Sequence, residues 1–202
     1  MKMKIKQKIL MEHLNYAIKG ISNKNLIPIL NCIKFDLTDD GLYLMSTDNE
    51  IAIKTFIDKD KIDLIEEKGE VVISGKYIYE IIRKLGNEVI NIEEVIDSQI
   101  LITTPTSSFK LNCNNVSEFP NLDLEFSKSP IIINQQLFKK TINQTIFATS
   151  TQESRPVLTG INFKINNNKL ICTATDSYRL ACKELELNET EIGDTDIIVP
   201  AR

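Results

Sequence analysis

The residue types that can perform catalysis are present in this sequence, but their spacing forms no known catalytic constellation. The one histidine, His13, lies on a segment with helical spacing, where a place on the surface or flank of a helix suits it better than catalysis. Ser150, Ser154 and Ser177 have no second histidine nearby in the sequence to act as a general base, and no G-x-S-x-G elbow surrounds them. We therefore predict no catalytic residues.

Motifs for phosphate, metal and redox chemistry are also missing. Ser74-Gly75-Lys76 is similar to the end of a phosphate-binding loop, but the G-x-x-x-x-G-K-[ST] pattern is absent. No two cysteines have the C-x2-C spacing of a zinc site or a redox motif, and a secreted disulfide scaffold would be denser in cysteine. We expect no cofactor, no metal and four reduced, mostly buried thiols: Cys32, Cys113, Cys172 and Cys182.

Asp48 and Asp176 look like a pair of catalytic acids, but each occupies the same place in an internal repeat. The segment Pro28–Lys54 aligns without gaps with Pro156–Cys182, at a constant offset of 128 residues (156 − 28). A Thr-Asp pair that follows a strand in both copies predicts a turn-forming structural element. The seven identical positions are Pro28/Pro156, Leu30/Leu158, Ile33/Ile161, Phe35/Phe163, Leu42/Leu170, Thr47/Thr175 and Asp48/Asp176.

Each copy of the repeat predicts a helix followed by a β-hairpin. The segments Ile9–Ile21 and Leu137–Ala148 have apolar residues at helical spacing, and Asn134 is a good N-cap for the second. Apolar residues then alternate with polar ones, as in half-buried strands, before a turn rich in Asp or Asn. The alternating apolar residues are Ile33, Phe35 and Leu37 in the first copy and Ile161, Phe163 and Ile165 in the second.

The segment after the first hairpin completes the predicted unit. A strand at 71–74 leads into a helix at Tyr77–Leu85, which Gly86 ends. Three strands follow, at Val89–Glu94, Ile100–Thr104 and Ser108–Cys113, so one unit reads β-α-β-β-β-β-α-β-β-β. The fold class that we predict is α+β, with a repeated unit of two helices packed on an antiparallel sheet.

The repeat also predicts the domains. Unit one occupies 1–127 and unit two occupies 128–202, with a boundary in the segment Ser127-Lys128-Ser129-Pro130. At a period of ~128 residues the second unit should continue to about residue 255, so the chain ends little more than halfway through it. We therefore expect the chain to be a fragment of a longer protein.

The net charge hides an uneven distribution of charge. The 202 residues hold 24 Lys and Arg against 28 Asp and Glu, a net charge of −4, which taken alone argues against a nucleic-acid partner. The segments 6–24, 75–86 and 134–149, which contain the three helices, nevertheless sum to +7 and leave −11 for the rest. Either Lys serves only as a good surface residue of helices, or one helix-bearing surface faces a polyanion. The sequence contains no base-reading motif, so contacts to DNA would go to phosphates.

The sequence contains no targeting or membrane segment. The basic start, 1–6, is not followed by an apolar run of signal-peptide length, and the longest apolar runs fall far short of the ~20 residues that a spanning helix needs. We expect a cytoplasmic location and no membrane partner.

Five segments give the chain a close resemblance to the N-terminal part of the bacterial DNA polymerase III beta subunit family, the sliding clamps. They cover the whole chain in the family's order: 26–30 (LIPIL), 46–48 (STD), 118–122 (EFPNL), 155–160 (RPVLTG) and 174–181 (ATDSYRLA). The resemblance implies the DNA-clamp fold, in which three such units per chain and two chains close into a homodimer ring. Helices would line the hole and sheets the outer surface.

The resemblance also implies site residues and partners. Double-stranded DNA, bound without regard to sequence, would meet Lys24, Lys76, Gln152, Arg155 and Arg202. A pocket for short linear motifs of the replicative polymerase and the clamp loader would include Leu158, Thr175, Ser177, Tyr178, Arg179 and Leu180. The subunit interface would include Ser107, Ser108 and Phe109.

The function implied is that of a non-catalytic processivity factor, which encircles duplex DNA and tethers the replicative polymerase during chromosomal replication. Two alternatives remain open from the residues alone. One is a small-ligand enzyme of α+β fold, although an enzyme needs a polar constellation that occurs once and the notable residues here are duplicated. The other is a peptide-binding scaffold with no DNA role.

Overall fold

The structure is a computed structural model, and it describes residues 1–21, 27–95, 98–122, 131–166, 168–187 and 194–201. The chain divides into two compact units, 1–123 and 124–202, and each is described by itself. The boundary that the sequence predicts, between 127 and 128, lies outside the described residues. In the described part of the chain, no helix is both long enough and apolar enough to cross a membrane.

Among its described residues, unit 1 combines two α-helices with nine strands. The helices are α1 (Gln7–Ala17), which continues into the short 3-10 helix η1 (Ile18–Gly20), and α2 (Gly75–Lys84). The strands are β1 (Lys2–Lys6), β2 (Cys32–Leu37), β3 (Gly41–Thr47), β4 (Ala52–Asp58), β5 (Leu64–Glu67), β6 (Gly69–Ser74), β7 (Val89–Val95), β8 (Gln99–Thr103) and β9 (Ser108–Asn114). The described residues also form the short 3-10 helices η2 (Pro28–Asn31), η3 (Lys59–Lys61) and η4 (Val116–Glu118).

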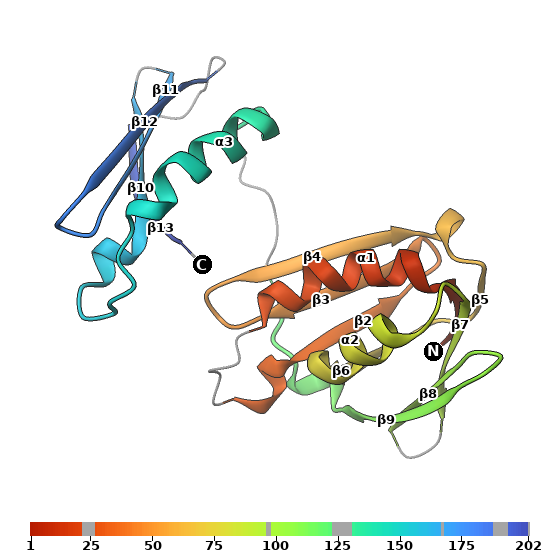
Figure 1. The fold of residues 1–202 in the computed structure, drawn as a ribbon. Helices are drawn as coiled ribbons and strands as arrows, with labels where there is room; N and C mark the ends of the chain where they lie inside the picture. Colours follow the sequence, from red (N-terminus) through yellow and green to blue (C-terminus); the bar gives the residue numbers. More distant parts are fainter. Residues whose placement is uncertain (22–26, 96–97, 123–130, 167, 188–193, 202) are drawn as a thin grey trace. The chain divides into compact units, whose positions relative to one another are not determined.

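These strands form one antiparallel sheet in the order β4-β3-β2-β6-β9-β8-β7-β1-β5. Both helices lie side by side against this sheet (Figure 1). Apolar residues on β2 and β3 point toward the helices, and Leu10, Leu14, Ile78 and Ile82 meet them from the helix side in one core. The predicted arrangement of two helices on an antiparallel sheet is confirmed.

Two details of the predicted unit are wrong. Among the described residues, five strands lie between α1 and α2, one more than the sequence pattern indicated. The extra strand, β5, pairs with β1 from the other end of the unit, and Lys2 binds Glu66 across this pairing at 2.9 Å. Such a long-range partner leaves no trace in local periodicity. The second detail is Lys6, which the charge sum assigned to the first helix segment. In the structure Lys6 is the last residue of β1, because β1 runs directly into α1.

The two helices of unit 1 run in opposite directions. The side-chain amide of Gln7, at the start of α1, donates to the Ile82 carbonyl oxygen near the end of α2 at 2.8 Å. Near the other end, the Tyr79 hydroxyl donates to the Asn15 side-chain oxygen at 3.0 Å. The solvent-facing sides of α1 and α2 therefore form one continuous helix surface.

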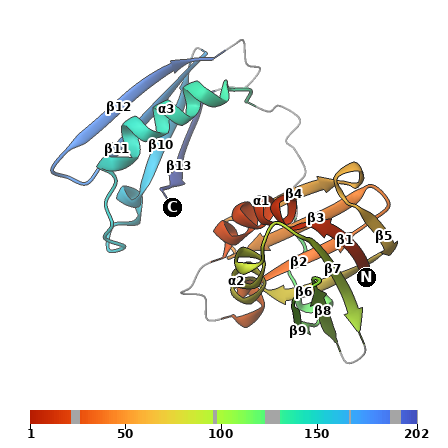
Figure 2. The same cartoon turned by 45° about the vertical axis from the view of Figure 1, so that its right-hand side comes forward.

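Unit 2 contains one helix and four strands among its described residues. Helix α3 (Gln135–Thr145) continues into η5 (Ile146–Ala148), and the short helix η6 (Pro156–Thr159) precedes the strands. The strands β10 (Gly160–Asn166), β11 (Lys169–Thr175), β12 (Leu180–Glu186) and β13 (Thr195–Pro200) form an antiparallel sheet in the order β12-β11-β10-β13, with α3 against it (Figure 2). The Asn134 side chain caps α3 by accepting from the Gln136 and Leu137 N–H groups, as predicted.

The internal repeat is confirmed element by element. Helix α3 begins 128 residues after α1, and β10, β11 and β12 begin 128 residues after β2, β3 and β4. The sheet order β12-β11-β10-β13 repeats the order β4-β3-β2-β6 of unit 1. In the Asn-rich turn of the second hairpin, Asn168 has a φ of 60°, the left-handed conformation that Asn tolerates.

The four cysteines differ sharply in accessibility. Burial raises the pKa of the Cys113 and Cys172 thiols to about 11, from an ordinary value of 9.0, and also raises the pKa of Cys32. Only Cys182 is exposed. Because the thiolate is the reactive form, two pKa units reduce the reactive fraction about 100-fold.

We expect a thiol reagent such as DTNB at neutral pH to modify Cys182 quickly in the folded chain. The other three thiols should react only after denaturant is added. Mass spectrometry of the partly modified protein would identify the fast site, and rapid modification of Cys172 would contradict the packing described.

Candidate functional site

Lysines on strands and loops are of two kinds, since some have a carboxylate partner and others, such as Lys110 and Lys183, have none among the described residues. Lys2, Lys34 and Lys68 bind carboxylates at 2.9, 3.0 and 2.8 Å, and Lys169 binds Glu184 at 3.5 Å. The exposed helical lysines have no ion pair with any residue that the structure describes; they are Lys8, Lys19, Lys76, Lys84, Lys139 and Lys140. The helix surfaces therefore carry positive charge that the chain itself does not neutralise.

In unit 1 this unneutralised charge is concentrated at both ends of the antiparallel helix pair. Lys19, on η1, and Lys76, at the start of α2, belong to the same end, because η1 contacts α2. Lys8 and Lys84 belong to the opposite end. Arg83 differs from these lysines, since it binds Glu80 one turn earlier at 2.7 Å. Such a surface attracts a polyanion.

The residues predicted to meet DNA are only partly described. Lys24 and Arg202 lie outside the described residues. Lys76 is exposed on α2, and Gln152 and Arg155 are exposed on the loop between η5 and η6. The Arg155 Nη1 group donates to the Ser177 hydroxyl at 3.2 Å, so a residue predicted for DNA contacts a residue predicted for the peptide pocket.

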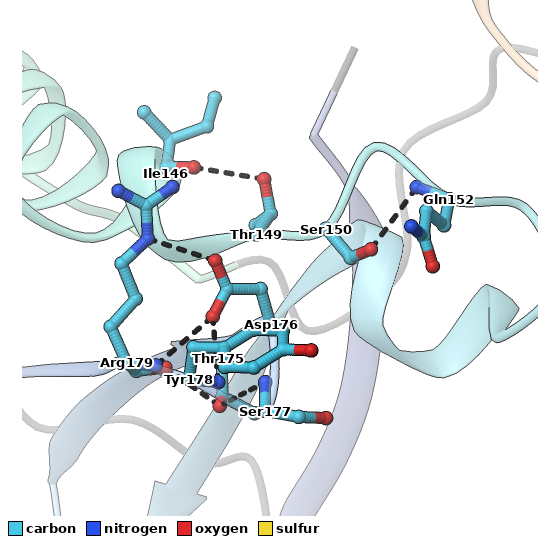
Figure 3. Close-up of polar contacts among 9 residues, drawn as sticks. All are labelled: Ile146, Thr149, Ser150, Gln152, Thr175, Asp176, Ser177, Tyr178 and Arg179. Carbon is cyan, nitrogen blue, oxygen red and sulfur yellow. Dashed lines mark hydrogen bonds and ion pairs between the residues drawn. The ribbon is translucent and has the colours of Figure 1, made fainter.

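The turn between β11 and β12 is built around Asp176 (Figure 3). One oxygen of the Asp176 carboxylate, Oδ1, accepts the backbone N–H groups of Tyr178 and Arg179, both at 3.0 Å. The Thr175 hydroxyl donates to the Arg179 carbonyl oxygen at 2.8 Å and accepts the Ser177 N–H at 3.2 Å. Ser177 takes a positive φ of 77°. Every predicted pocket residue from Thr175 to Leu180 is therefore placed by this turn.

The same turn occurs in unit 1. Asp48 Oδ1 accepts the N–H groups of Glu50 and Ile51 at 3.1 and 2.9 Å, and the Thr47 hydroxyl accepts the Asn49 N–H at 3.1 Å. Asn49 has a φ of 75°, close to that of Ser177. The Thr-Asp pair is therefore a turn-forming element in both units, as predicted from the repeat.

The side chains around the turn differ between the two units. Unit 2 exposes Tyr178 at 97%, Leu180 at 67% and Phe147 at 56%, together with Val157. By the repeat offset, these four occupy the places of Glu50, Ala52, Lys19 and Ile29 in unit 1. Leu158 is partly exposed, whereas its counterpart Leu30 is buried in unit 1. Unit 2 thus presents four apolar or aromatic residues where unit 1 has two charged residues, an alanine and an isoleucine.

Arg179 adds one cation to this apolar surface. Its Nε group donates to Asp176 Oδ2 at 2.9 Å, and its guanidinium lies 5.7 Å from the centre of the Phe147 ring. Phe147 and Asp176 were not among the predicted pocket residues. The alignment of the repeat could have identified Phe147, because an aromatic residue occupies a position where unit 1 has Lys19.

The predicted subunit-interface residues lie on the β8–β9 hairpin of unit 1. Ser107 closes the turn, since its carbonyl oxygen accepts the Thr104 N–H at 2.9 Å. Ser108 and Phe109 begin β9, where they pair with Thr103 and Ile102. Phe109 remains 36% exposed, although it lies on a strand that is paired on one side by β8. The three residues are consecutive in the chain, and their interface role remains a prediction.

His13 Nδ1 contacts the Thr55 hydroxyl at 2.6 Å and joins α1 to β4, which confirms its predicted place on a helix flank. No group of three or more His, Cys, Asp or Glu side chains in the described ranges could hold a metal ion.

The pKa of Asp176 provides a test of the turn. The Tyr178 N–H donates to this carboxylate and holds its pKa below the ordinary value of 3.8, with further help from Arg179. Because the folded pKa is lowered, the stabilisation is present above the ordinary pKa and is lost as pH falls through the folded value.

We expect an NMR titration of the Asp176 carboxyl group to have its midpoint below 3.8, with the amide signals of Tyr178 and Arg179 changing over the same pH range. In Asp176→Asn these two amides should show no such transition. A carboxyl midpoint above 3.8 would contradict the turn.

Comparisons with known proteins cover both units. A family model described as "DNA polymerase III beta subunit, N-terminal domain" matches residues 1–123, and one described as the central domain of the same subunit matches 132–202. The beta sliding clamp of Bacillus subtilis is 35% identical over 206 residues, covering 100% of this chain and 54% of that protein. This chain spans about half the length of the curated relatives that it matches.

Solved structures that resemble this chain belong to the same family. A crystal structure of the Bacillus subtilis sliding clamp matches with a TM-score of 0.92 at 35% identity and covers 100% of this chain and 54% of that one. The Helicobacter pylori beta clamp bound to a DNA ligase peptide matches with a TM-score of 0.86, covering 100% of this chain and 56% of that chain, and at 24% identity shows the shared fold alone.

Proposed function

The chain belongs to the bacterial DNA polymerase III beta subunit family, and we propose that it forms the first unit and part of the second unit of a DNA sliding clamp. The full protein would be a non-catalytic processivity factor in the cytoplasm that encircles duplex DNA as a homodimer ring. By holding the replicative polymerase on DNA, the ring raises the effective concentration of polymerase at the template.

The observation that carries the DNA role is the unneutralised charge of the helix surfaces. A residue that pairs with a carboxylate of its own chain has little left to offer a phosphate, and Lys2, Lys34 and Lys68, which lie outside the helices, are paired in this way. Lys8, Lys19, Lys76 and Lys84 are exposed and keep their charge for a partner. Contacts of this kind go to phosphates, are indifferent to sequence and weaken with salt, which allows a ring to slide.

We expect the double variant Lys19→Glu with Lys76→Glu, made in the full-length protein, to bind duplex DNA more weakly. The slope of log K against log salt should become shallower by about 0.9 for each phosphate contact that is lost. A filter-binding or fluorescence-anisotropy titration on a duplex of mixed sequence at several salt concentrations measures both quantities.

The matched control is Lys59→Glu with Lys183→Glu, which changes net charge equally on residues outside α1, α2 and α3. If both pairs weakened binding equally, net charge and not the helix surface would explain the effect. If neither pair had any effect, the scaffold without a DNA role would be the better hypothesis.

We also propose a peptide-binding role for the surface around the unit 2 turn. Tyr178 and Leu180, which flank Arg179 in the chain, are exposed, as is Val157 on η6, and exposed apolar groups of this kind mark binding surfaces. The partners would be the replicative polymerase and the clamp loader, bound through short linear motifs. Leu180→Ala in the full-length protein should weaken binding of a synthetic DNA ligase peptide, the kind of ligand named for the Helicobacter pylori clamp.

A further inference from the structure

Arg179 is fixed along one edge of its guanidinium group. The Nε group of Arg179 donates to Asp176 Oδ2 at 2.9 Å. The backbone N–H of Arg179 donates to the other carboxylate oxygen, Asp176 Oδ1, at 3.0 Å (Figure 3). The Phe147 ring lies 5.7 Å from the guanidinium carbon. A carboxylate at one edge and an aromatic ring near the guanidinium restrict the rotamers of a side chain that is otherwise among the most flexible.

The other edge of the guanidinium is free. Neither Nη1 nor Nη2 of Arg179 has a hydrogen-bond partner among the residues that the structure describes, and the side chain is 56% exposed. Two N–H₂ groups are therefore held in a fixed direction without an acceptor. Ordering a donor before a ligand arrives lowers the entropy lost on binding.

The turn itself does not require this arrangement. Unit 1 forms the same turn with Ile51 in the place of Arg179 and Asn49 in the place of Ser177. At the place of Phe147, unit 1 has Lys19. The aromatic and the cation of unit 2 therefore stand where unit 1 has a lysine and an isoleucine. Since the fold is satisfied without them, their pairing in unit 2 points to a role in binding.

Charge decides which kind of acceptor the free edge suits. The Asp176 carboxylate already neutralises the guanidinium and would repel a second carboxylate placed close to it. A neutral main-chain carbonyl oxygen accepts from the remaining N–H groups without this repulsion. Leu180, the next residue in the chain, is exposed and suits an apolar side chain of the same ligand.

We infer that Asp176 and Phe147 are positioning residues that hold Arg179 so that its Nη groups donate to a main-chain carbonyl oxygen of a bound peptide. This inference rests on the peptide-binding role proposed above. The inference adds the group that the peptide must present, which is a main-chain carbonyl oxygen. It also adds Asp176 and Phe147, which act through Arg179 and do not themselves contact that oxygen.

The test measures binding of the synthetic DNA ligase peptide to the full-length protein by calorimetry. Asp176→Asn keeps an oxygen for the backbone N–H groups of the turn but removes the charge that holds Nε, and we expect the affinity to fall about 3- to 10-fold. Phe147→Leu keeps apolar volume but loses the ring, and we expect a fall of about 2- to 5-fold. The matched control is Asp48→Asn, which makes the same change in the unit 1 turn and should leave affinity unchanged.

A second readout separates positioning from a general structural effect. The Arg179 Nε–H signal in a ¹⁵N NMR spectrum should be protected from exchange in the parent protein and in Asp48→Asn, and lose that protection in Asp176→Asn. The salt dependence of peptide affinity should be weak, since the acceptor carries no charge.

The possible results separate the two proposals. If Leu180→Ala weakens binding while Asp176→Asn and Phe147→Leu do not, the positioning role is wrong and the peptide site stands. If Asp176→Asn strengthens binding, the acceptor is a carboxylate and the inference is overturned. If none of these variants changes affinity, the peptide-binding role proposed for this surface fails as well.

Discussion

Replacing Phe35 with Ala is expected to lower the free energy of unfolding of unit 1 by about 3–5 kcal/mol, the usual cost of removing a buried aromatic side chain. Phe35 is 0% exposed and lies on β2, with Leu44 and Val71 as its neighbours on the adjacent strands. All three belong to the core beneath α1 and α2. The loss is large because these strands and helices cannot all move to fill the space.

The matched control is the same substitution at Phe163, the identical position of the repeat in unit 2. Phe163 is only partly buried, and its main aromatic neighbour is Phe138, edge to face with the ring centres 5.9 Å apart. We expect Phe163→Ala to cost about 1–2 kcal/mol, since part of the surface it removes is already in water.

Hydrogen exchange measured by mass spectrometry would assign each loss to its own unit, which matters because a chain of two units need not unfold in one step. Equal losses at the two positions would contradict the burial difference.

Replacing Gly20 with Ala is expected to destabilise unit 1 by about 1–3 kcal/mol, although Ala is normally the better helix former. A Cβ atom at Gly20 would collide with the Ser46 hydroxyl oxygen and lie 3.2 Å from the Ser46 carbonyl oxygen. That hydroxyl is buried and donates to the Ala17 carbonyl oxygen at 2.6 Å, so moving it breaks a buried hydrogen bond.

Unit 2 indicates how the effect should be rescued. The counterparts of Gly20 and Ser46 in unit 2 are Ala148 and Ala174, and both are buried. Unit 2 therefore has a methyl group at the helix end where unit 1 has Gly20, and lacks the hydroxyl that Ser46 has on the strand. We expect Ser46→Ala alone to cost about 1 kcal/mol, and the double variant to cost less than the sum of the two singles.

A double-mutant cycle on thermal or denaturant unfolding measures this coupling. Additive losses would mean that Gly20 and Ser46 do not compete for the same space.

Much of the fold could be predicted from local patterns. The repeat, the helix before each hairpin and the Asn134 cap follow from spacing within segments of a few turns or strands, where side-chain periodicity reports burial directly. The strand β5 could not be predicted in the same way, because its partner β1 lies about 60 residues earlier in the chain. Lys24 and Arg202, which the sequence predicts to meet DNA, lie outside the described residues.

The candidate sites divide similarly. The sequence placed Thr175 to Leu180 after a strand and identified Asp176 as a turn former by its duplication. Nothing local indicated that Arg179 would meet Phe147, since the two residues come from a turn and from the end of a helix segment. Nor could composition distinguish Lys34, which is paired with Glu70, from Lys76, which has no carboxylate partner in the described part of the chain.

By itself the sequence determined the repeated unit, the place of its turns and the concentration of basic residues on the helix segments. Those properties depend on residues close together in the chain. The tertiary structure alone decided which of two identical phenylalanines is fully buried, which lysines remain unneutralised and how one arginine is held. Each of these depends on the approach of segments far apart in the sequence, and burial and charge pairing are properties of that approach.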